Sequence, residues 1–271
     1  MARMTEILKD FFDSEKIEYR GVLSYSDCHE YRADIMARES FTPRSVIIFL
    51  LPYYGGGTDN LSLYAAARDY HIIIREVTGR LCSLLSEKYP GSHSKGYGDH
   101  SPLDERGAAL SAGLGILGEN GLIINEKYGS YVFIADVITD IPPESLGATP
   151  KKELRRCPGC GACRRACPTG ILRGEGESCL SAITQKKGEL TDDEIALMKK
   201  YNTVWGCDVC QTACPYNRSP VITPIEFFLR DRVERLDTET LAAMDKAEFS
   251  SRAFAWRGRR TVERNLKYLD I

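Results

Sequence analysis

The chain lacks any run of about 18 consecutive apolar residues, the length that a membrane-spanning helix requires. Its first 20 residues are charged throughout and show no apolar stretch with a cleavage site, which argues against a signal peptide there. The net charge is only −2 over 271 residues, so overall charge gives no reason to expect nucleic acid or a membrane as a partner. We therefore expect a cytoplasmic protein without membrane contact.

Histidine is scarce, with four residues, whereas cysteine is abundant, with ten. Eight of the ten lie between Cys157 and Cys214. Ten cysteines could form a disulfide framework, but such frameworks are typical of small secreted domains, whereas larger intracellular chains more often use clustered cysteines as metal ligands. The clustering therefore favours metal binding. Cys28 and Cys82 lie outside the cluster, and we expect them to be buried small apolar side chains.

The first cysteine block has the C-x2-C-x2-C-x3-C-P spacing of bacterial two-cluster ferredoxins, in which three thiolates bind one [4Fe–4S] cubane and the fourth binds the other. The second block has one cysteine too few, and Cys179, between the blocks, is the obvious replacement. The crossed pattern then assigns the ligands to two clusters: Cys157, Cys160, Cys163 and Cys214 for one, and Cys167, Cys179, Cys207 and Cys210 for the other. Two zinc sites are the competing interpretation, because paired C-x2-C units also suit tetrahedral zinc. Such cubanes usually transfer electrons, and a purely structural role is the alternative.

Hydrophobic periodicity predicts a mixture of helices and strands. The expected helices cover residues 4–18, 60–88 and 104–112, with further helices after 215, and the expected strands cover 45–52, 122–125 and 131–138. Prolines and glycines over 141–150 predict a boundary near residue 148. We expect three segments: an α/β cofactor and substrate domain over 1–148, a double-cluster domain over 149–220 and a helical extension over 221–271.

Several segments outside the cysteine blocks resemble epoxyqueuosine reductase, the cobalamin-dependent iron–sulfur enzyme of queuosine-tRNA maturation. Residues 64–71 (YAAARDYH) are similar to that family's Y-A-x-G-x-D-Y-H helix, and residues 99–106 (DHSPLDER) to its D-S-A-P-V-L-E-R segment. Residues 112–120 (AGLGILGEN) resemble A-G-L-G-W-I-G-K-N, and residues 179–210 resemble the cysteine-serine and G-C-D-x-C segments. Together the similar segments cover about residues 45–217.

The resemblance implies an α+β fold, with a nitroreductase-related, cobalamin-binding-like α/β domain followed by a bacterial two-[4Fe–4S] ferredoxin-like domain. It implies an oxidoreductase that passes electrons through both clusters to a corrinoid, which then reduces a small or nucleoside-like substrate. A ferredoxin or flavodoxin would supply the electrons, and tRNA becomes a candidate partner. Asp99 takes the position of the family's proton donor, and the implied cofactor-binding residues are Arg68, Tyr70, Gly113, Gly115, Gly118 and Ser181.

Asp99 also has a structural interpretation. Asp99 or Ser101, followed by Asp104 and Glu105, is typical of a helix start, where such a side chain caps free backbone N–H groups. A proton donor must instead be protonated near the reacting atom, which an enclosed apolar pocket favours by raising the pKa of a carboxyl group. The resemblance favours the donor. For Arg68 and Tyr70 the alternatives are a surface salt bridge and a core tyrosine. For His71 we expect a structural hydrogen bond rather than cobalt ligation, and His100 is the other histidine to consider.

Gly113, Gly115 and Gly118 also match the G-x-G-x-x-G dinucleotide fingerprint, and Asp136 follows at a plausible distance. The fingerprint needs a strand before it and a helix after it, whereas this sequence predicts the reverse order. We therefore expect no dinucleotide there and assign the glycines to the approach of backbone amides to a corrinoid.

The chain departs from the family pattern at three points. It ends at Ile271, without the helical-repeat domain that helps the family bind tRNA, and its opening segment is short. Glu119 and Ile116 replace a lysine and a tryptophan, and an anion in place of a cation reverses the local field. An electron-transfer protein with two clusters and no corrinoid is the alternative function. A tRNA-binding accessory that uses basic residues over 151–165 and near the C-terminus is a third.

Overall fold

The computed structural model describes residues 4–271, which form two compact units. Unit 1 comprises the chain up to Pro52 together with His71–Pro158, and unit 2 comprises Tyr53–Tyr70 together with Gly159–Ile271. The chain therefore enters unit 2 once, returns to unit 1, and enters unit 2 again at the cysteine segment. The division into 1–148, 149–220 and 221–271 stays a prediction.

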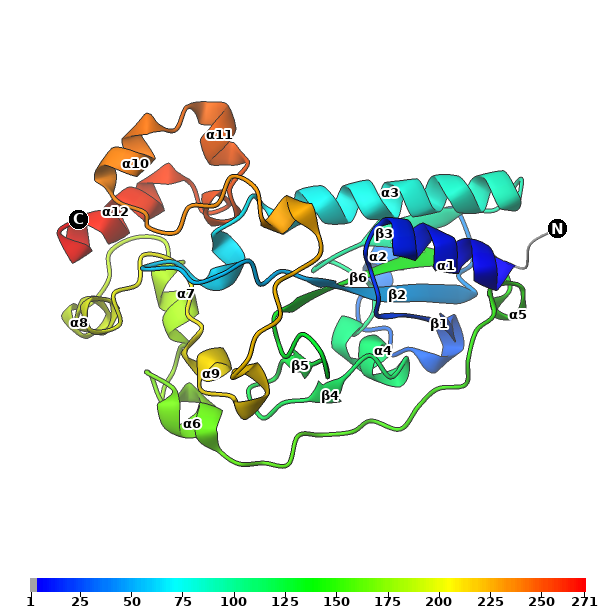
Figure 1. The fold of residues 1–271 in the computed structure, drawn as a ribbon, viewed down its shortest axis with the longest axis horizontal. Coiled ribbons are helices and arrows are strands. Elements are labelled where there is room, and N and C mark those ends of the chain that lie inside the picture. Colours follow the sequence, from blue (N-terminus) through cyan, green and yellow to red (C-terminus); the bar gives the residue numbers. More distant parts are fainter. Residues whose placement is uncertain (1–3) are drawn as a thin grey trace. The chain divides into compact units, whose positions relative to one another are not determined.

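Unit 1 combines antiparallel strands with helices, as the sequence predicts (Figure 1). Its elements are α1 (Met4–Ser14), β1 (Arg20–Ser24), α2 (Ala33–Met36), β2 (Ser45–Pro52), most of α3 (Tyr70–Lys88), β3 (Ser94–Tyr97), α4 (Glu105–Ser111), β4 (Ile116–Leu117), β5 (Ile123–Ile124), β6 (Val132–Thr139) and α5 (Pro143–Leu146). The sheet order is β1-β2-β6-β3, and β4 pairs with β5 in a separate hairpin. All of these pairs are antiparallel.

Strand β2 lies inside the sheet and is buried at all eight positions, which explains its unbroken apolar sequence. Successive side chains of a strand point to opposite faces of the sheet. On one face, Ile48 and Ile138 pack with Ala109 of α4 in a common core. On the other face, Phe49 packs against Phe12 of α1, with 5.2 Å between the ring centroids. The sheet is therefore covered on both sides.

Helix α3 begins at Tyr70, so the helix predicted over 60–88 is wrong for residues 60–69. The carboxylate of Asp208 accepts hydrogen bonds from the Ser62 hydroxyl at 2.8 Å and from the Leu63 backbone N–H at 2.6 Å. Leu61 meanwhile forms a parallel bridge with Trp205. These tertiary contacts hold the segment outside the helix, because they outweigh the small free energy of helix propensity.

Unit 2 is built from short helices around a core that contains the fully buried Trp205. Its helices are α6 (Ala162–Ala166), α7 (Leu180–Thr184), α8 (Asp192–Lys200), α9 (Val209–Thr212), α10 (Thr238–Ala243), α11 (Lys246–Ser250) and α12 (Arg259–Leu269). Helix α8 begins with a capping box, in which Thr191 and Glu194 each bond the other's backbone N–H. The helices expected after residue 215 are confirmed.

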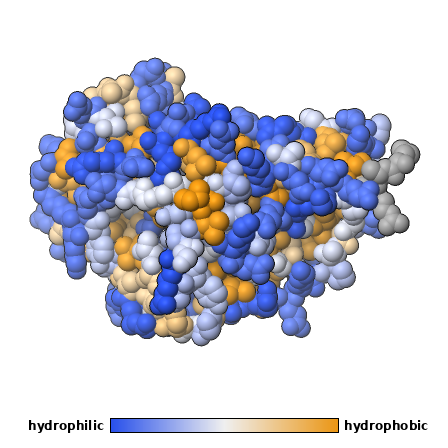
Figure 2. Space-filling model, in the orientation of Figure 1, coloured by the Kyte–Doolittle hydropathy of each residue, from blue (hydrophilic) through white to orange (hydrophobic). Residues whose placement is uncertain are grey.

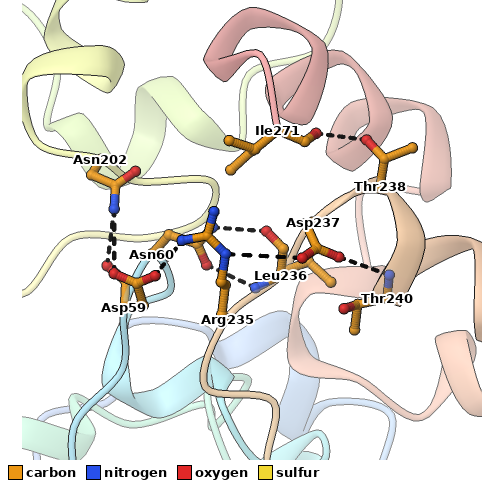
Figure 3. A network of polar contacts seen from close by, with 9 residues as sticks. All are labelled: Asp59, Asn60, Asn202, Arg235, Leu236, Asp237, Thr238, Thr240 and Ile271. Atoms are coloured by element: carbon orange, nitrogen blue, oxygen red, sulfur yellow. Dashed lines mark hydrogen bonds and ion pairs between the residues drawn. The ribbon is translucent and has the colours of Figure 1, made fainter.

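A polar network ties residues 59–60 to the segment before α10 (Figure 3). The Asn60 amide donates to the Leu236 carbonyl at 2.7 Å and accepts from the Leu236 N–H at 2.8 Å. Asp59 forms an ion pair with Arg235. Asn60 is only 2% exposed, so its amide satisfies two backbone groups that water cannot reach. This network explains why residues 53–70 belong to unit 2.

The visible face is mostly hydrophilic, with apolar side chains scattered across it (Figure 2). The exposed large apolar residues include Tyr216, Ile222 and Trp256. Across residues 4–271, no helix combines the length and the apolar character needed to cross a membrane.

Candidate functional site

The cysteine segment brings its two blocks together in unit 2. Cys163 lies on α6 and Cys210 lies on α9, and these two helices pack against each other. Cys163, Cys167 and Cys214 are buried, and Cys160 is exposed. Two motifs separated by about forty residues in the sequence are thus neighbours, as a pair of clusters with crossed ligation requires.

Cys167, Cys179 and Cys207 are close enough to interact electrostatically. Burial raises the pKa of the Cys207 thiol to about 11, and the charges of Cys179, Asp208 and Cys167 raise it further. Such a group of thiols is unfavourable as thiolates alone, and a cationic iron centre reverses that balance. Three of the four ligands predicted for the second cluster therefore share one environment.

Hydrogen bonds around Cys167 favour the thiolate form of its side chain. Burial raises the pKa of its thiol, but backbone N–H groups of Leu172, Thr169 and Gly170, together with the Thr169 hydroxyl, lower it more, so the pKa falls below its usual range. The Thr169 hydroxyl oxygen lies 3.8 Å from the Cys167 sulfur. Amides directed at a sulfur also stabilise a cluster-bound thiolate and tune the cluster's potential.

Cys157 belongs to the edge of unit 1, three residues before Cys160. Its N–H donates to the Leu117 carbonyl at 2.9 Å, and the Leu117 N–H donates to the Arg155 carbonyl at 2.8 Å. Strand β4 thus fixes the backbone at the first cysteine. No three His, Cys, Asp or Glu side chains among residues 4–271 converge as ligands of one metal ion would. A cubane instead takes its thiolates at separate iron corners, which lie farther apart.

Unit 1 contains an open pocket of about 560 Å³ that includes Asp99. The pocket is lined by His29, Tyr31, Asp99, Asp104, Glu105, Arg106, Val132, Phe133 and Ile134. Its acidic residues come from the β3–α4 connection and the start of α4, and its apolar wall comes from the first residues of β6. A carboxyl group beside an apolar wall is a typical setting for proton transfer.

Asp99 has a backbone φ of +64°, a left-handed conformation that residues other than glycine rarely adopt. Its N–H donates to Oε1 of Glu105 at 3.0 Å, which helps to hold this conformation. Its carboxylate lies 3.7 Å from Nε2 of His71, and its side chain is half exposed. Strained backbone of this kind is common at functional sites.

Asp99 does not cap the following helix. Helix α4 begins at Glu105 with Asp104 as its N-cap residue, and the Ser101 hydroxyl accepts from the Leu103 N–H at 3.2 Å. The capping interpretation of Asp99 and Ser101 is therefore wrong. The Asp99 side chain instead lines the pocket, five positions before the N-cap residue.

Two carboxyl groups near Asp99 were missed as functional residues. Burial is the main cause that raises the pKa of Glu105 to about 8, and the charges of Asp136, Asp99 and Asp104 raise it further. The hydrogen bond from the Asp99 N–H lowers this pKa but does not cancel the rise. Burial also raises the pKa of Asp136 to about 7, with the Ser101 hydroxyl opposing the shift. An ionisable residue inside the apolar run YVFIADVI was the available signal for Asp136. For Glu105 the signal was its place in the D-x-S-P-x-x-E-R motif.

The glycines predicted to approach a corrinoid do not line this pocket. Gly113 follows the C-terminus of α4 with a φ of +75°, and a Cβ at Gly115 would lie 2.6 Å from the Ile124 carbonyl oxygen. Contacts within the chain therefore already account for both. The stretch lies between α4 and β4, the helix-then-strand order that argues against a dinucleotide site.

The remaining predicted cofactor residues all lie in unit 2. Arg68 is exposed and lines a second pocket, of about 860 Å³. Tyr70 opens α3 in edge contact with Tyr64, and the Ser181 hydroxyl accepts from the Gln185 amide at 3.0 Å. Their assignment to a cofactor stays a prediction. Cys28 and Cys82 are partly buried, and burial raises the pKa of each thiol, to about 12 and about 11.

Comparison with known proteins supports the double-cluster interpretation of the cysteine segment and the family resemblance of the chain. A family model described as a 4Fe-4S double cluster binding domain matches residues 156–217, which include all eight clustered cysteines. The chain is 36% identical over 211 residues to the epoxyqueuosine reductase of Listeria monocytogenes, covering 73% of this chain and 53% of that protein. It is 34% identical over 213 residues to the Bacillus subtilis enzyme, covering 73% and 52%.

Solved structures give the same result for the fold. The epoxyqueuosine reductase of Streptococcus thermophilus matches with a TM-score of 0.75 at 23% identity, covering 97% of this chain and 80% of that chain. A catabolic reductive dehalogenase matches with a TM-score of 0.50 at 16% identity, covering 96% and 37%. The mixed helix-and-sheet fold is therefore confirmed, and so is the presence of a double-cluster domain.

The chain spans about half the length of the curated relatives it matches. The resemblance stated from the sequence is confirmed over that part, and it extends across most of this chain.

Proposed function

Because the chain belongs to the epoxyqueuosine reductase family, we propose that it is an iron–sulfur oxidoreductase with Asp99 as its proton donor. Electrons would pass through two [4Fe–4S] clusters to a corrinoid, and the substrate would be small or nucleoside-like. The observation that carries the proposal is the position of Asp99 in a pocket next to two carboxyl groups of raised pKa, in a chain that also has a double-cluster domain.

The electron path rests on the cysteine segment. We assign one cluster to the ligands Cys157, Cys160, Cys163 and Cys214 and the other to Cys167, Cys179, Cys207 and Cys210. The packing of α6 on α9 and the shared environment of Cys167, Cys179 and Cys207 support this division. When bound, such clusters accept and release single electrons over short distances. The chain's own contribution is burial and N–H···S bonding, which Cys167 already shows.

The corrinoid is proposed from homology and from the chemistry of the pocket. Val132, Phe133 and Ile134 offer apolar contacts to a flat ring system, and Asp99 would supply a proton beside them. When bound, a reduced corrinoid supplies a strong cobalt-centred nucleophile. The residues that the family resemblance assigns to cofactor binding, Arg68, Tyr70, Gly113, Gly115, Gly118 and Ser181, do not line this pocket, and their role stays a prediction.

The substrate is proposed from a relative. An epoxyqueuosine reductase with a TM-score of 0.74 to this chain was solved with an epoxyqueuosine-modified tRNA-Tyr stem loop. That nucleoside is therefore the first substrate to test. Reduction of an epoxide consumes protons as well as electrons, so a positioned acid is required, and Asp99 meets that requirement. A structure of the Bacillus subtilis enzyme shows an aspartate-bearing catalytic loop swung out of the active site. Asp99 likewise lies in a loop, between β3 and α4. A ferredoxin or flavodoxin is the proposed electron donor.

Cofactor content tests the proposal. We expect anaerobically purified chain to contain about eight iron and eight sulfide per molecule, and about one cobalt after reconstitution with cobalamin. The visible spectrum should show bound corrinoid. Full iron content with no retained corrinoid, together with reduction of a redox partner but of no substrate, would instead establish the chain as an electron-transfer protein.

A further inference from the structure

Asp136 is a buried carboxyl group with little polar contact. It lies on β6 and is 0% exposed, neither carboxylate oxygen has a partner at ordinary hydrogen-bond geometry among the residues that the structure describes, and the Ser101 hydroxyl is the one group that lowers its pKa. Its strand neighbours are Ile48 on β2 and Tyr97 on β3. A buried carboxylate with so little polar contact is strongly destabilised, so the group is expected to carry a proton.

Strand geometry places Asp136 directly behind the pocket. Alternate residues of a strand point to the same face, so Val132, Ile134 and Asp136 share one face of β6. Val132 and Ile134 line the pocket, and α4 packs on the same strand. Asp136 is therefore the next side chain beyond the pocket wall, about 7 Å along the strand from Ile134.

Glu105 connects this buried group to the pocket. It is the first residue of α4, it lines the pocket, and its Oε1 accepts the Asp99 N–H at 3.0 Å. The charge of Asp136 is one cause of the raised pKa of Glu105, so ionisation of Asp136 makes Glu105 hold its proton more strongly. When two acids interact in this way, the pair holds its proton more strongly than either acid would alone.

The groups around the pair are mostly acidic or neutral. The carboxyl groups of Asp99 and Asp104 face Glu105, and Tyr97 and Cys28 interact electrostatically with Asp136. Two basic groups lie near the pocket: Arg106 donates to the Gly121 carbonyl at 2.9 Å, and His71 lies 3.7 Å from the Asp99 carboxylate rather than against Glu105 or Asp136. His29 also lines the pocket. The surroundings therefore favour a protonated pair.

We propose that Glu105 and Asp136 form a proton-holding pair that keeps one exchangeable proton beside Asp99 and returns it to Asp99 after each donation. This inference rests on the proposed function of Asp99. Asp99 gives its proton to the substrate and becomes a carboxylate. Glu105 then transfers its proton to the Asp99 carboxylate, and water entering the open pocket reprotonates the pair. No electrons move in these transfers. Glu105 also positions Asp99 through the hydrogen bond to its N–H.

An infrared titration of the carboxyl C=O stretch tests the pair directly, in cluster-loaded chain without corrinoid or substrate. Ordinary carboxyl groups titrate near pH 4, so a protonated signal at pH 7 isolates the unusual ones. We expect the wild type to lose this signal in two steps, near pH 7 and pH 8. Asp136→Asn should lower the midpoint of the remaining Glu105 step by about one unit or more, because a neighbouring negative charge is gone.

Glu105→Gln should leave only the lower step, and Glu105→Asp, which keeps a carboxyl group, should retain two. Glu87→Gln on the exposed face of α3 is the matched control and should titrate as the wild type does. Absence of any protonated signal at pH 7, or an unchanged Glu105 midpoint in Asp136→Asn, overturns the proposal. If Asp136→Asn does not fold, Glu105→Gln decides alone, since an unchanged two-step titration in that variant contradicts the pair.

A pH profile separates proton supply from a purely structural role. In enzyme reconstituted for turnover, Asp136→Asn should move the alkaline limb of kcat to lower pH by about one unit or more, because Glu105 then loses its proton earlier. A structural effect would instead lower kcat equally at every pH, and that result contradicts the proposal. Because the infrared titration needs neither corrinoid nor substrate, it can fail or succeed independently of the proposed function.

Discussion

The cysteine segment and the Asp99 pocket differ in how their residues are distributed along the chain. The cluster ligands follow a fixed local spacing, and only the replacement by Cys179 and the crossing between blocks require long-range contacts. The pocket instead joins a loop, a helix start and a strand, and its buried acid lies 37 positions after Asp99. Chemistry that depends on local spacing can be recognised in a sequence, whereas chemistry that depends on an assembled environment needs the fold.

The largest expected effect is a loss of iron when one cysteine of the cluster segment is replaced. Cys163→Ser should reduce iron from about eight to about four or fewer per chain, because a buried ligand of one cubane is lost. Cys82→Ser is the matched control and should retain full iron, since Cys82 lies outside the cluster segment. Anaerobic iron and sulfide analysis measures both. Equal iron loss in the two variants would mean that general destabilisation, not ligation, causes the change.

On the pocket side, Asp136→Asn should stabilise the protein at neutral pH. The pKa of Asp136 rises from 3.8 to about 7 on folding, so the folded state favours the neutral acid. The associated stability is complete below pH 4 and is lost as the pH rises to about 7. The variant and the wild type should therefore unfold alike at pH 4, and the gap should widen to at most about 4 kcal/mol by pH 8.

Anaerobic denaturant unfolding at several pH values measures this gap. A variant that is less stable than the wild type at pH 8 would show that the Asp136 carboxylate has a stabilising partner.

Within unit 2, breaking the polar network of Figure 3 should have a smaller effect on the stability of the fold. Asn60→Ala should lower the free energy of unfolding by about 2–4 kcal/mol, because it leaves the buried N–H and C=O of Leu236 unsatisfied. The control is Asn202→Ala, whose exposed amide makes only long bonds to Asp59, at 3.4 and 3.5 Å. It should change stability by less than about 0.5 kcal/mol. Equal effects in denaturant unfolding would contradict this account.

The smallest expected effect is at a helix end. Thr191→Ala should remove the capping box of α8 and cost about 1 kcal/mol, whereas Thr191→Ser should retain most of the stability. Thermal unfolding followed by circular dichroism can resolve the difference. Neither variant should alter iron content, because Thr191 lies outside the cysteine blocks.

The sequence predicted most of the elements because their signals are local. Strand 45–52 was predicted to the residue, and the helix expected over 104–112 is α4 with its two cap residues. The error at 60–69 arose because bonds from Asp208 and Leu236 override helical periodicity, and both residues are distant in sequence. For Asp136 the sequence showed only an ionisable residue in an apolar run, and its raised pKa required the fold, since burial on β6 between β2 and β3 causes the shift.

The most direct test of the central claim is turnover of an epoxyqueuosine-modified tRNA stem loop by reduced, cobalamin-reconstituted chain, with wild type compared to Asp99→Ala. The account predicts that the wild type reduces the nucleoside, and that the variant keeps both clusters and the corrinoid but is about 10²–10⁴-fold slower. Equal rates in the two proteins, with equal cofactor content, would show that Asp99 is not the proton donor.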